Sequence, residues 1–347
     1  MHREIRGLIA ACAALLAAAL PVAGGTARAQ LQGGGADWDS TAREYRGGQS
    51  AGAGASGAAG PSVPAAARNA TIENLSKILS ASQLSPLDRS FYLSIRAFAY
   101  SRLGREAESQ KDVAEMARVN PQGWPVILSF IMPGLAGGGD RGAALRALGY
   151  GLQKKPNDAW LLIGQAQVQM QIADFGRALG TLDSALASAG TAGERRNASY
   201  FRGHANLATG HFDQSASDFE ASIAGQTTLE GRIWGALWRY AAQVRGRHDA
   251  RGALARDLGS ENLYQWPGPI ARFLLGRLPA GELEVAAESD DAAKKTNGKC
   301  MAAYFIGMDA VRRGDRQRAR EQLQLAQARC PTVSEYNWAA SNELKRL

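Results

Sequence analysis

The chain has 347 residues, of which 45% are hydrophobic and 21% are charged, and its formal net charge is +8. This excess is mild, and no stripe of lysines with interleaved aromatic residues occurs, so the composition argues against nucleic acid as a partner. The basic residues are scattered and mostly neighboured by acids, which is typical of solvated helix faces. Beyond residue 20, no apolar run reaches the roughly 18 residues that a transmembrane helix needs.

Residues 1–29 have the pattern of a secretory signal peptide. Arg3 and Arg6 precede an apolar run over residues 8–20, and Ala27-Arg28-Ala29 is a small-x-small site before Gln30. We therefore expect cleavage after Ala29 and export to the periplasm. Cys12 loosely resembles a lipobox cysteine, but the apolar run continues well beyond it, which favours a small residue inside the signal over a lipid anchor.

Residues 30–69 are rich in Gly, Ala and Ser and contain few large apolar side chains. Such a segment cannot bury enough apolar surface to offset its ordering entropy, so we expect a disordered tether.

A repeated spacing organises the rest of the chain. Three glycines each stand seventeen residues before a proline, in the pairs Gly104 and Pro121, Gly139 and Pro156, and Gly314 and Pro331. A period near 34 residues, with a turn glycine in the middle and a proline at the end, predicts a stack of antiparallel helix pairs. Arrays of this kind are more often binding surfaces than enzymes.

Residues 70–228 show this pattern from end to end. We expect a first helix over 70–81, a second from Ser85-Pro86 to Leu103, and its mate over 105–119. Pro125 and Pro133 predict a short or kinked helix before a regular one over 140–154. Asp158 is expected to cap the next pair. The pair over 194–226 is the most regular.

Residues 229–297 follow the pattern less closely. Trp234 and Trp238 share a helical face, residues 259–269 predict an irregular connector, and short helices are expected over 270–276 and 280–288. The sequence leaves open whether this segment packs as repeats or forms a separate cap. Residues 298–347 predict a final pair and a terminal helix over 334–346 that closes the stack.

The small residues at helix contacts and the closing prolines resemble tetratricopeptide (TPR) repeats. The match is good over 86–121, 194–226 and 298–331, and partial over 122–190. Three C-terminal features are similar to the NlpI-type family of exported bacterial TPR proteins: Trp266-Pro267-Gly268-Pro269, Cys300 followed by Tyr304-Phe305-Ile306-Gly307, and Glu335-Tyr336. The resemblance implies an all-α, right-handed superhelical array of antiparallel helix pairs. In that family the array serves as an envelope scaffold. This sequence departs from the family because it lacks a credible lipobox cysteine.

Cys300 and Cys330 remain after removal of the signal. Cys300 begins the first helix of the last pair and Cys330 ends the second, so antiparallel packing places them side by side. An oxidising compartment then favours a disulfide, with two buried free thiols as the alternative. Two sulfurs without a nearby histidine are too few ligands for a metal.

The sequence gives no support for catalysis. The histidines that remain are His204, His211 and His248, and none belongs to a recognisable Ser–His–acid or Cys–His signature. No Walker loop or zinc-protease helix occurs, so we expect no enzyme activity and no cofactor.

Candidate binding residues follow from the repeat frame, in which the first helix of each pair lines a concave groove. These candidates are Phe91, Ser94, Phe98, Arg102, Asp158, Leu161, Gln165, Gln169, Asn197, Tyr200, His204, Tyr304, Met308 and Arg312. Aromatic, amide and methionine side chains suit peptide capture. The alternative is that Phe91, Phe98 and Tyr304 belong to the core between repeats.

These observations favour a periplasmic scaffold that binds other envelope proteins or peptides through its concave groove. The alternative is a carrier or sensor whose groove binds a non-protein acidic ligand, peptidoglycan or anionic lipid, helped by the positive charge. The sequence does not determine the oligomeric state.

Overall fold

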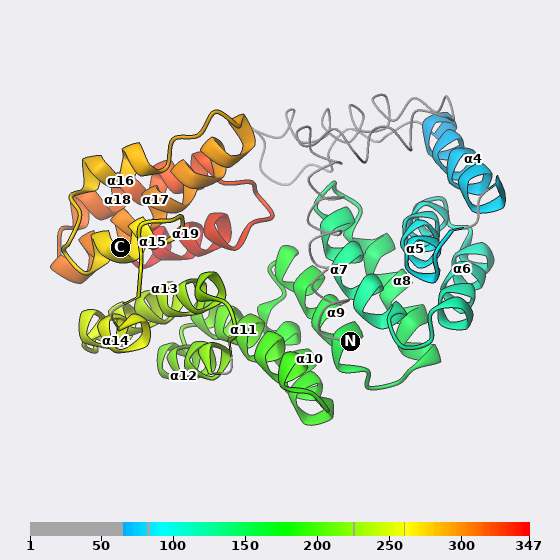
Figure 1. Ribbon diagram of the computed structural model, residues 1–347, viewed down its shortest axis with the longest axis horizontal. Helices are drawn as coiled ribbons and strands as arrows, with labels where there is room; N and C mark the ends of the chain where they lie inside the picture. Colours follow the sequence, from blue (N-terminus) through cyan, green and yellow to red (C-terminus); the bar gives the residue numbers. More distant parts are fainter. Residues whose placement is uncertain (1–64, 82–83, 225, 260) are drawn as a thin grey trace. The chain divides into compact units, whose positions relative to one another are not determined.

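The computed structural model describes residues 65–81, 84–224, 226–259 and 261–347 (Figure 1). Over these ranges the chain forms sixteen α-helices and no β-strand, which confirms the all-α prediction. The predicted signal peptide, and the predicted tether up to residue 64, lie outside the described residues. The chain divides into two compact units within α9 (Ala159–Gln171). Unit one ends at Val168 and unit two begins at Gln169.

Unit one is built from α4 to the greater part of α9. The first five of these helices are α4 (Ala65–Ala81), α5 (Pro86–Arg102), α6 (Glu106–Val119), α7 (Trp124–Ala136) and α8 (Arg141–Lys154). The Oγ atom of Ser85 accepts the backbone N–H of Asp88 at 3.1 Å and Pro86 occupies the first turn, as the sequence predicted. Asp158 Oδ1 likewise accepts the backbone N–H groups of Trp160 and Leu161.

One expectation for unit one needs correction. Helix α4 begins at Ala65, so residues 65–69 are helical and do not belong to the tether. Three consecutive alanines explain this, because alanine has the highest helix propensity. Helix α7, where Pro125 and Pro133 predicted a short or kinked element, runs over the 13 residues from Trp124 to Ala136. Pro125 lies in its first turn, where an N–H has no intrahelical partner, whereas Pro133 lies inside the helix and cannot donate a backbone hydrogen bond to the carbonyl of Ser129.

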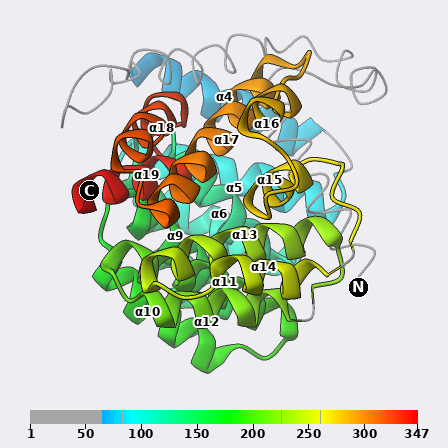
Figure 2. The same ribbon diagram turned by 90° about the vertical axis from the view of Figure 1, so that its left-hand side faces the viewer.

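Unit two contains the last residues of α9 and ten further helices, whose labels α10 to α19 can be followed in Figures 1 and 2. They are α10 (Phe175–Ser188), α11 (Ala192–Thr209), α12 (Phe212–Ile223), α13 (Leu229–Gly246), α14 (Ala250–Leu258), α15 (Gly268–Leu274), α16 (Ala280–Ala286), α17 (Ala292–Arg313), α18 (Arg316–Arg329) and α19 (Glu335–Arg346). Helix α13 packs against α12, α14, α15 and α17. The segment over 229–297, which the sequence left open, is therefore packed within unit two.

A single turn geometry recurs between the two helices of successive pairs. The residue at its centre is left-handed in six turns, at Gly104, Ala173, Gly210, Arg247, Gly276 and Gly314, with φ between 59° and 89°. In each turn the next backbone N–H donates to the carbonyl four residues before the central residue, at 2.8–3.0 Å. These are the hydrogen bonds of the Schellman motif, which satisfies the free carbonyls at a helix end. The turn at Gly139 lacks this bond and bonds Gly139 N–H to Ala136 O.

Cross-helix hydrogen bonds also recur at equivalent positions in two of the pairs. Arg96 of α5 binds both carboxylate oxygens of Asp112 on α6, at 2.8 and 2.7 Å. Arg202 of α11 binds Asp218 on α12 in the same way, and both arginines lie eight residues before the turn glycine. Ser109 Oγ donates to Ala97 O and Ser215 Oγ donates to Gly203 O, each at 2.8 Å. The α5–α6 and α11–α12 pairs thus share the same arrangement of cross-helix hydrogen bonds.

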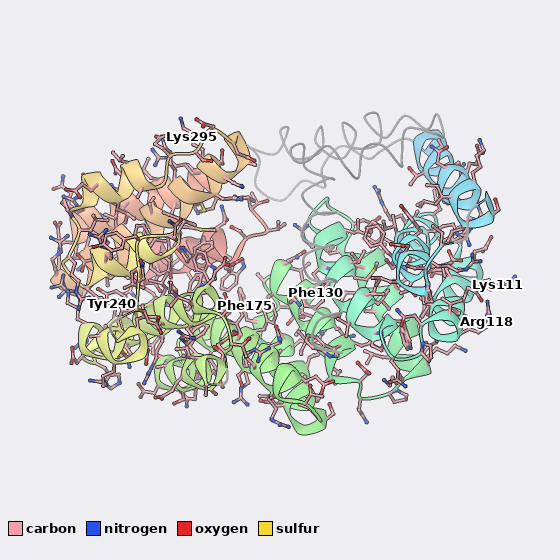
Figure 3. The ribbon with its side chains drawn as sticks, in the orientation of Figure 1. Lys111, Arg118, Phe130, Phe175, Tyr240 and Lys295 are labelled. Atoms are coloured by element: carbon pink, nitrogen blue, oxygen red, sulfur yellow. A yellow bond between two sulfur atoms is a disulfide. The ribbon has the colours of Figure 1, made fainter. Side chains whose placement is uncertain are left out.

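Each unit has its own apolar core. In unit one, Leu93, Phe98, Met116, Leu128 and Leu148 are almost completely buried between α5, α6, α7 and α8. The core of unit two is aromatic and includes Phe219, Trp238, Tyr240, Tyr304 and Phe305. Figure 3 marks Tyr240 among the side chains of unit two and shows Lys111 and Arg118 on the outer side of α6. Among the described helices, none has the length and apolar character required to cross a bilayer.

The predicted cysteine pair forms a disulfide. Cys300 in α17 and Cys330 at the end of α18 are bonded, with Cα atoms 5.0 Å apart, and both side chains are buried. The structure therefore contains the disulfide and not the alternative of two free thiols. The bond fastens the two helices of the last pair to each other, next to the start of α19.

Candidate partner-binding surface

The fourteen predicted groove residues do not form an open surface. Seven of them are buried: Ser94, Phe98, Leu161, Gln169, His204, Tyr304 and Met308. The other seven are half-buried: Phe91, Arg102, Asp158, Gln165, Asn197, Tyr200 and Arg312. This corrects the prediction for the buried positions, because a side chain without exposed surface cannot contact a partner unless the fold rearranges. For Phe98 and Tyr304, the alternative placement in the core is the one observed.

In unit one, the candidate positions are occupied by contacts within the unit. Helix α5 packs against α6, α7 and α8, which uses the face that carries Ser94 and Phe98. The guanidinium of Arg102 lies 5.7 Å from the Phe98 ring centroid and forms an ion pair with Asp140. Leu161 packs so closely on Gly151 that an added Cβ there would lie 3.2 Å from it. These residues hold the pairs together.

In unit two, the chain's own last helix covers the candidate face. Helix α19 packs against α11, α17 and α18, so it lies over first helices of the pairs and does not simply extend the stack. Tyr336 of α19 lies 4.9 Å from Trp238 and 5.8 Å from Tyr304 between ring centroids. The ring centroid of Trp338 lies 5.3 Å from that of Phe175, the residue at the start of α10. The apolar face of α19 thus occupies the place where the sequence predicted a peptide.

His204 stands at the centre of this aromatic contact. The rings of Tyr200, Phe219, Trp238 and Trp338 surround it at centroid distances of 4.4–5.6 Å, all close to perpendicular. Neither ring nitrogen has a hydrogen-bond partner among the described residues. Burial lowers the pKa of His204 to about 3, because the cation loses its hydration there. The imidazole is therefore neutral at physiological pH and acts as a packing residue.

A buried carboxylate organises the arginines at the end of α17. Asp309 is almost fully buried, accepts the hydroxyl of Tyr240 at 3.2 Å and pairs with Arg312 and Arg313 at about 3 Å. Arg251 approaches it at 3.7 Å. Burial, followed by the charge of Asp309, raises the pKa of Tyr240. Arg312, a predicted groove residue, is thus held by Asp309 and by the Tyr240 hydroxyl.

A second buried carboxylate connects α19 to α13. Glu343 is 1% exposed and forms ion pairs with Arg245 of α13 and with Arg346 one turn further along α19. Arg346 also donates to the carbonyls of Leu207 and Ala208 at the end of α11, at 3.0 and 2.8 Å. These contacts fix the position of α19 on unit two.

Helix α18 carries a basic surface that the sequence pattern did not indicate. Arg316, Arg318, Arg320 and Arg329 are exposed, and their guanidinium groups have no acidic partner in the described part of the chain. The acids that neighbour them in sequence are used elsewhere: Asp315 caps α18 through the backbone N–H of Arg318, and Glu321 accepts a hydrogen bond from Gln317. Sequence proximity to acids was therefore a poor indicator of neutralised charge here.

Neither metal-binding clusters nor relatives supply a function. In the described ranges, no group of three or more His, Cys, Asp or Glu side chains is arranged to hold a metal ion. No protein-family model matches the sequence. A comparison with curated proteins likewise finds no match. The function must therefore be inferred from the residues and their arrangement.

Proposed function

We propose that this chain is an exported scaffold protein of the TPR type, with repeats arranged as a right-handed superhelix, that binds other proteins of the bacterial envelope. The observation that carries the proposal is the recurrence of equivalent hydrogen bonds in the α5–α6 and α11–α12 pairs, together with the recurring turn. Repeats of this kind give extended surfaces suited to protein binding. The signal-like residues 1–29 support export to the periplasm, and the C-terminal resemblance to the NlpI-type family supports an envelope role. The proposal includes no catalytic step and no cofactor.

The burial of the candidate residues changes where a partner is expected. The positions left for contact are the half-buried members of the candidate set and the outer faces of the second helices. Lys111 on α6 and Gln324 on α18 are exposed residues of this second kind, one in each unit.

The experiment is site-specific photo-crosslinking in the native host. A photoreactive amino acid replaces Lys111 in one full-length variant and Gln324 in another, and crosslinked proteins are captured and identified by mass spectrometry. We expect specific envelope proteins to crosslink at one or both sites. The matched control carries the same amino acid at the buried position Leu148, where no partner can reach it. An identical capture from the control, or no protein at either exposed site, would contradict the proposal.

A second candidate function is favoured by the arginines of α18. A carrier or sensor for an acidic envelope ligand, peptidoglycan or anionic lipid, would use these uncompensated charges. It predicts salt-sensitive binding of the purified protein to isolated peptidoglycan or to phosphatidylglycerol vesicles. Absence of binding at low salt would reject it.

A further inference from the structure

Two adjoining hollows lie at the beginning of α18. The first, of about 210 Å³, is lined by Arg245, Val311, Gly314, Arg316, Arg346 and Leu347. The second is a wider, open hollow of about 610 Å³ lined by Arg316, Gln317, Arg320, Glu321 and Gln324. Arg316 belongs to both. We name the surface formed by the lining residues of the two hollows the arginine face.

The arginine face has more positive than negative side chains. Arg245 and Arg346 share one carboxylate, that of Glu343, and Arg316 has none among the described residues. Arg320 likewise has no acidic partner there. Glu321 lines the second hollow as well, where it accepts a hydrogen bond from Gln317 and keeps its negative charge. A guanidinium presents a planar fork of donors that matches a carboxylate with two parallel hydrogen bonds. The surface is thus suited to several carboxylates of one ligand.

The spacing of these charges matches an extended peptide. Arg316 and Arg320 are four residues apart on a helix, which separates them by about 6 Å along the axis. In an extended chain, alternate residues point the same way and are about 6.6 Å apart. Acidic side chains at every second residue of an extended segment would therefore meet Arg316 and Arg320 in turn. Gln324 lies one helical turn beyond Arg320 in the same lining, and its amide supplies a donor and an acceptor for a peptide group.

A lipid surface fits this face less well. A helix that lies in a membrane interface buries an apolar face there. The apolar residues of α18, Ala319, Leu323 and Ala326, are buried within unit two, and of its exposed side chains only Leu325 is large and apolar. Arginine and glutamine without apolar anchors favour recognition of a peptide.

We propose that the arginine face binds an extended acidic segment of a partner protein, with Glu or Asp at alternate positions. Arg316 and Arg320 each take one carboxylate, and Arg245 and Arg346 add positive potential at one end of the segment. This inference deepens the proposed scaffold function and rests on it for its biological meaning. Its test uses a defined peptide and is independent of the crosslinking experiment. Peptide binding can fail while crosslinking to envelope proteins succeeds, and crosslinking can fail while the peptide binds.

The test is fluorescence anisotropy of a labelled peptide of alternating Glu and Gly, titrated with the full-length protein at low salt. We expect saturable binding that the Arg316→Gln/Arg320→Gln variant weakens by about tenfold or more, because two charge-assisted contacts are lost. The matched control is Arg256→Gln/Arg277→Gln, which removes the same charge from exposed positions of unit two. This control should bind as the unchanged protein does.

Several results would overturn the proposal. Equal losses in the two double variants would show that net charge alone drives binding. Equal affinity for the peptide with Gln in place of Glu would exclude recognition of carboxylates, and equal affinity for a peptide with Glu at every third residue would exclude the alternate spacing. Binding to phosphatidylglycerol vesicles without binding to the peptide would assign the face to a membrane. Circular dichroism of both variants is the control for folding.

Discussion

The recurring turn predicts that one substitution, glycine to alanine, changes the free energy of unfolding in opposite directions at two sites of unit two. Gly210 is left-handed, with φ of 89°, and an added Cβ would meet no atom within 4 Å, so the cost of Gly210→Ala is purely conformational. An L-residue in this region costs about 1–2 kcal/mol, and the stiffer unfolded chain returns roughly 0.4–1 kcal/mol. We expect Gly210→Ala to lower the free energy of unfolding by about 1 kcal/mol.

The matched control is Gly180→Ala in the interior of α10. Its Cβ would also meet nothing within 4 Å, but its backbone is ordinary helix. Alanine is the better helix former there by about 1 kcal/mol, so this variant should be stabilised. Ala173→Gly supplies the reverse test, because Ala173 already has φ of 59°. This variant should raise the free energy of unfolding by roughly 0.5–1 kcal/mol.

The measurement is urea and thermal unfolding followed by the helical circular dichroism signal. A change of 1 kcal/mol shifts the midpoint of a unit of this size by about 2–4 °C. Stabilisation by Gly210→Ala, or destabilisation by Ala173→Gly, would refute the assignment of these residues to left-handed turns. Equal changes in the free energy of unfolding for Gly210→Ala and Gly180→Ala would show that the backbone conformation does not determine whether alanine stabilises or destabilises the fold.

Three further variants test the packing. Gly164→Ala should destabilise unit one by about 1–3 kcal/mol, because the new Cβ would lie 2.7 Å from the Ser129 Cα atom, and unchanged urea unfolding would contradict that contact. Cys300→Ser/Cys330→Ser should lower the unfolding free energy by about 3 kcal/mol, because it removes a crosslink across 30 residues. The bond itself is checked by intact-mass analysis of the unchanged protein after alkylation with and without reductant. Identical masses in the two samples would exclude the disulfide. The pKa of His204 lies at about 3 when folded and near 6.5 when unfolded, so the unfolded state takes up the proton first. The stability that neutral His204 provides is therefore complete above pH 6.5 and is lost as the pH falls towards 3, at up to about 1.4 kcal/mol per pH unit. His204→Phe should flatten this dependence in pH-resolved urea unfolding, and an unchanged slope would show that His204 is not its source.

Much of the helical architecture could be read from local signals. Ser85-Pro86 and Asp158 begin helices where the sequence predicted them, since capping depends on a side chain and the next three residues. The period also placed Cys300 and Cys330 side by side, because antiparallel neighbours in a repeat have a fixed offset. Gly104 and Gly314 marked turns for a local reason as well, their freedom to adopt positive φ.

The turns at Ala173 and Arg247 carried no such signal. Neither residue favours the left-handed conformation, yet both occupy the position that glycine holds in equivalent turns. Packing of the helices on either side supplies the energy that offsets the local cost, and a local reading of the sequence does not contain that energy. The same applies to arginine pairing, since Arg245 meets Glu343 from 98 positions away.

The sequence by itself determined that this chain forms paired helices with a regular period, where most of them begin, and which cysteines meet. Only the tertiary structure decided which faces remain available for a partner. Arg346 bonds to the carbonyl of Leu207 across 139 positions of the chain, and Trp338 closes over His204, so α19 buries the face that the repeat frame left open. Helical periodicity depends on neighbours three or four residues apart, whereas burial depends on contacts between distant segments, which periodicity does not specify.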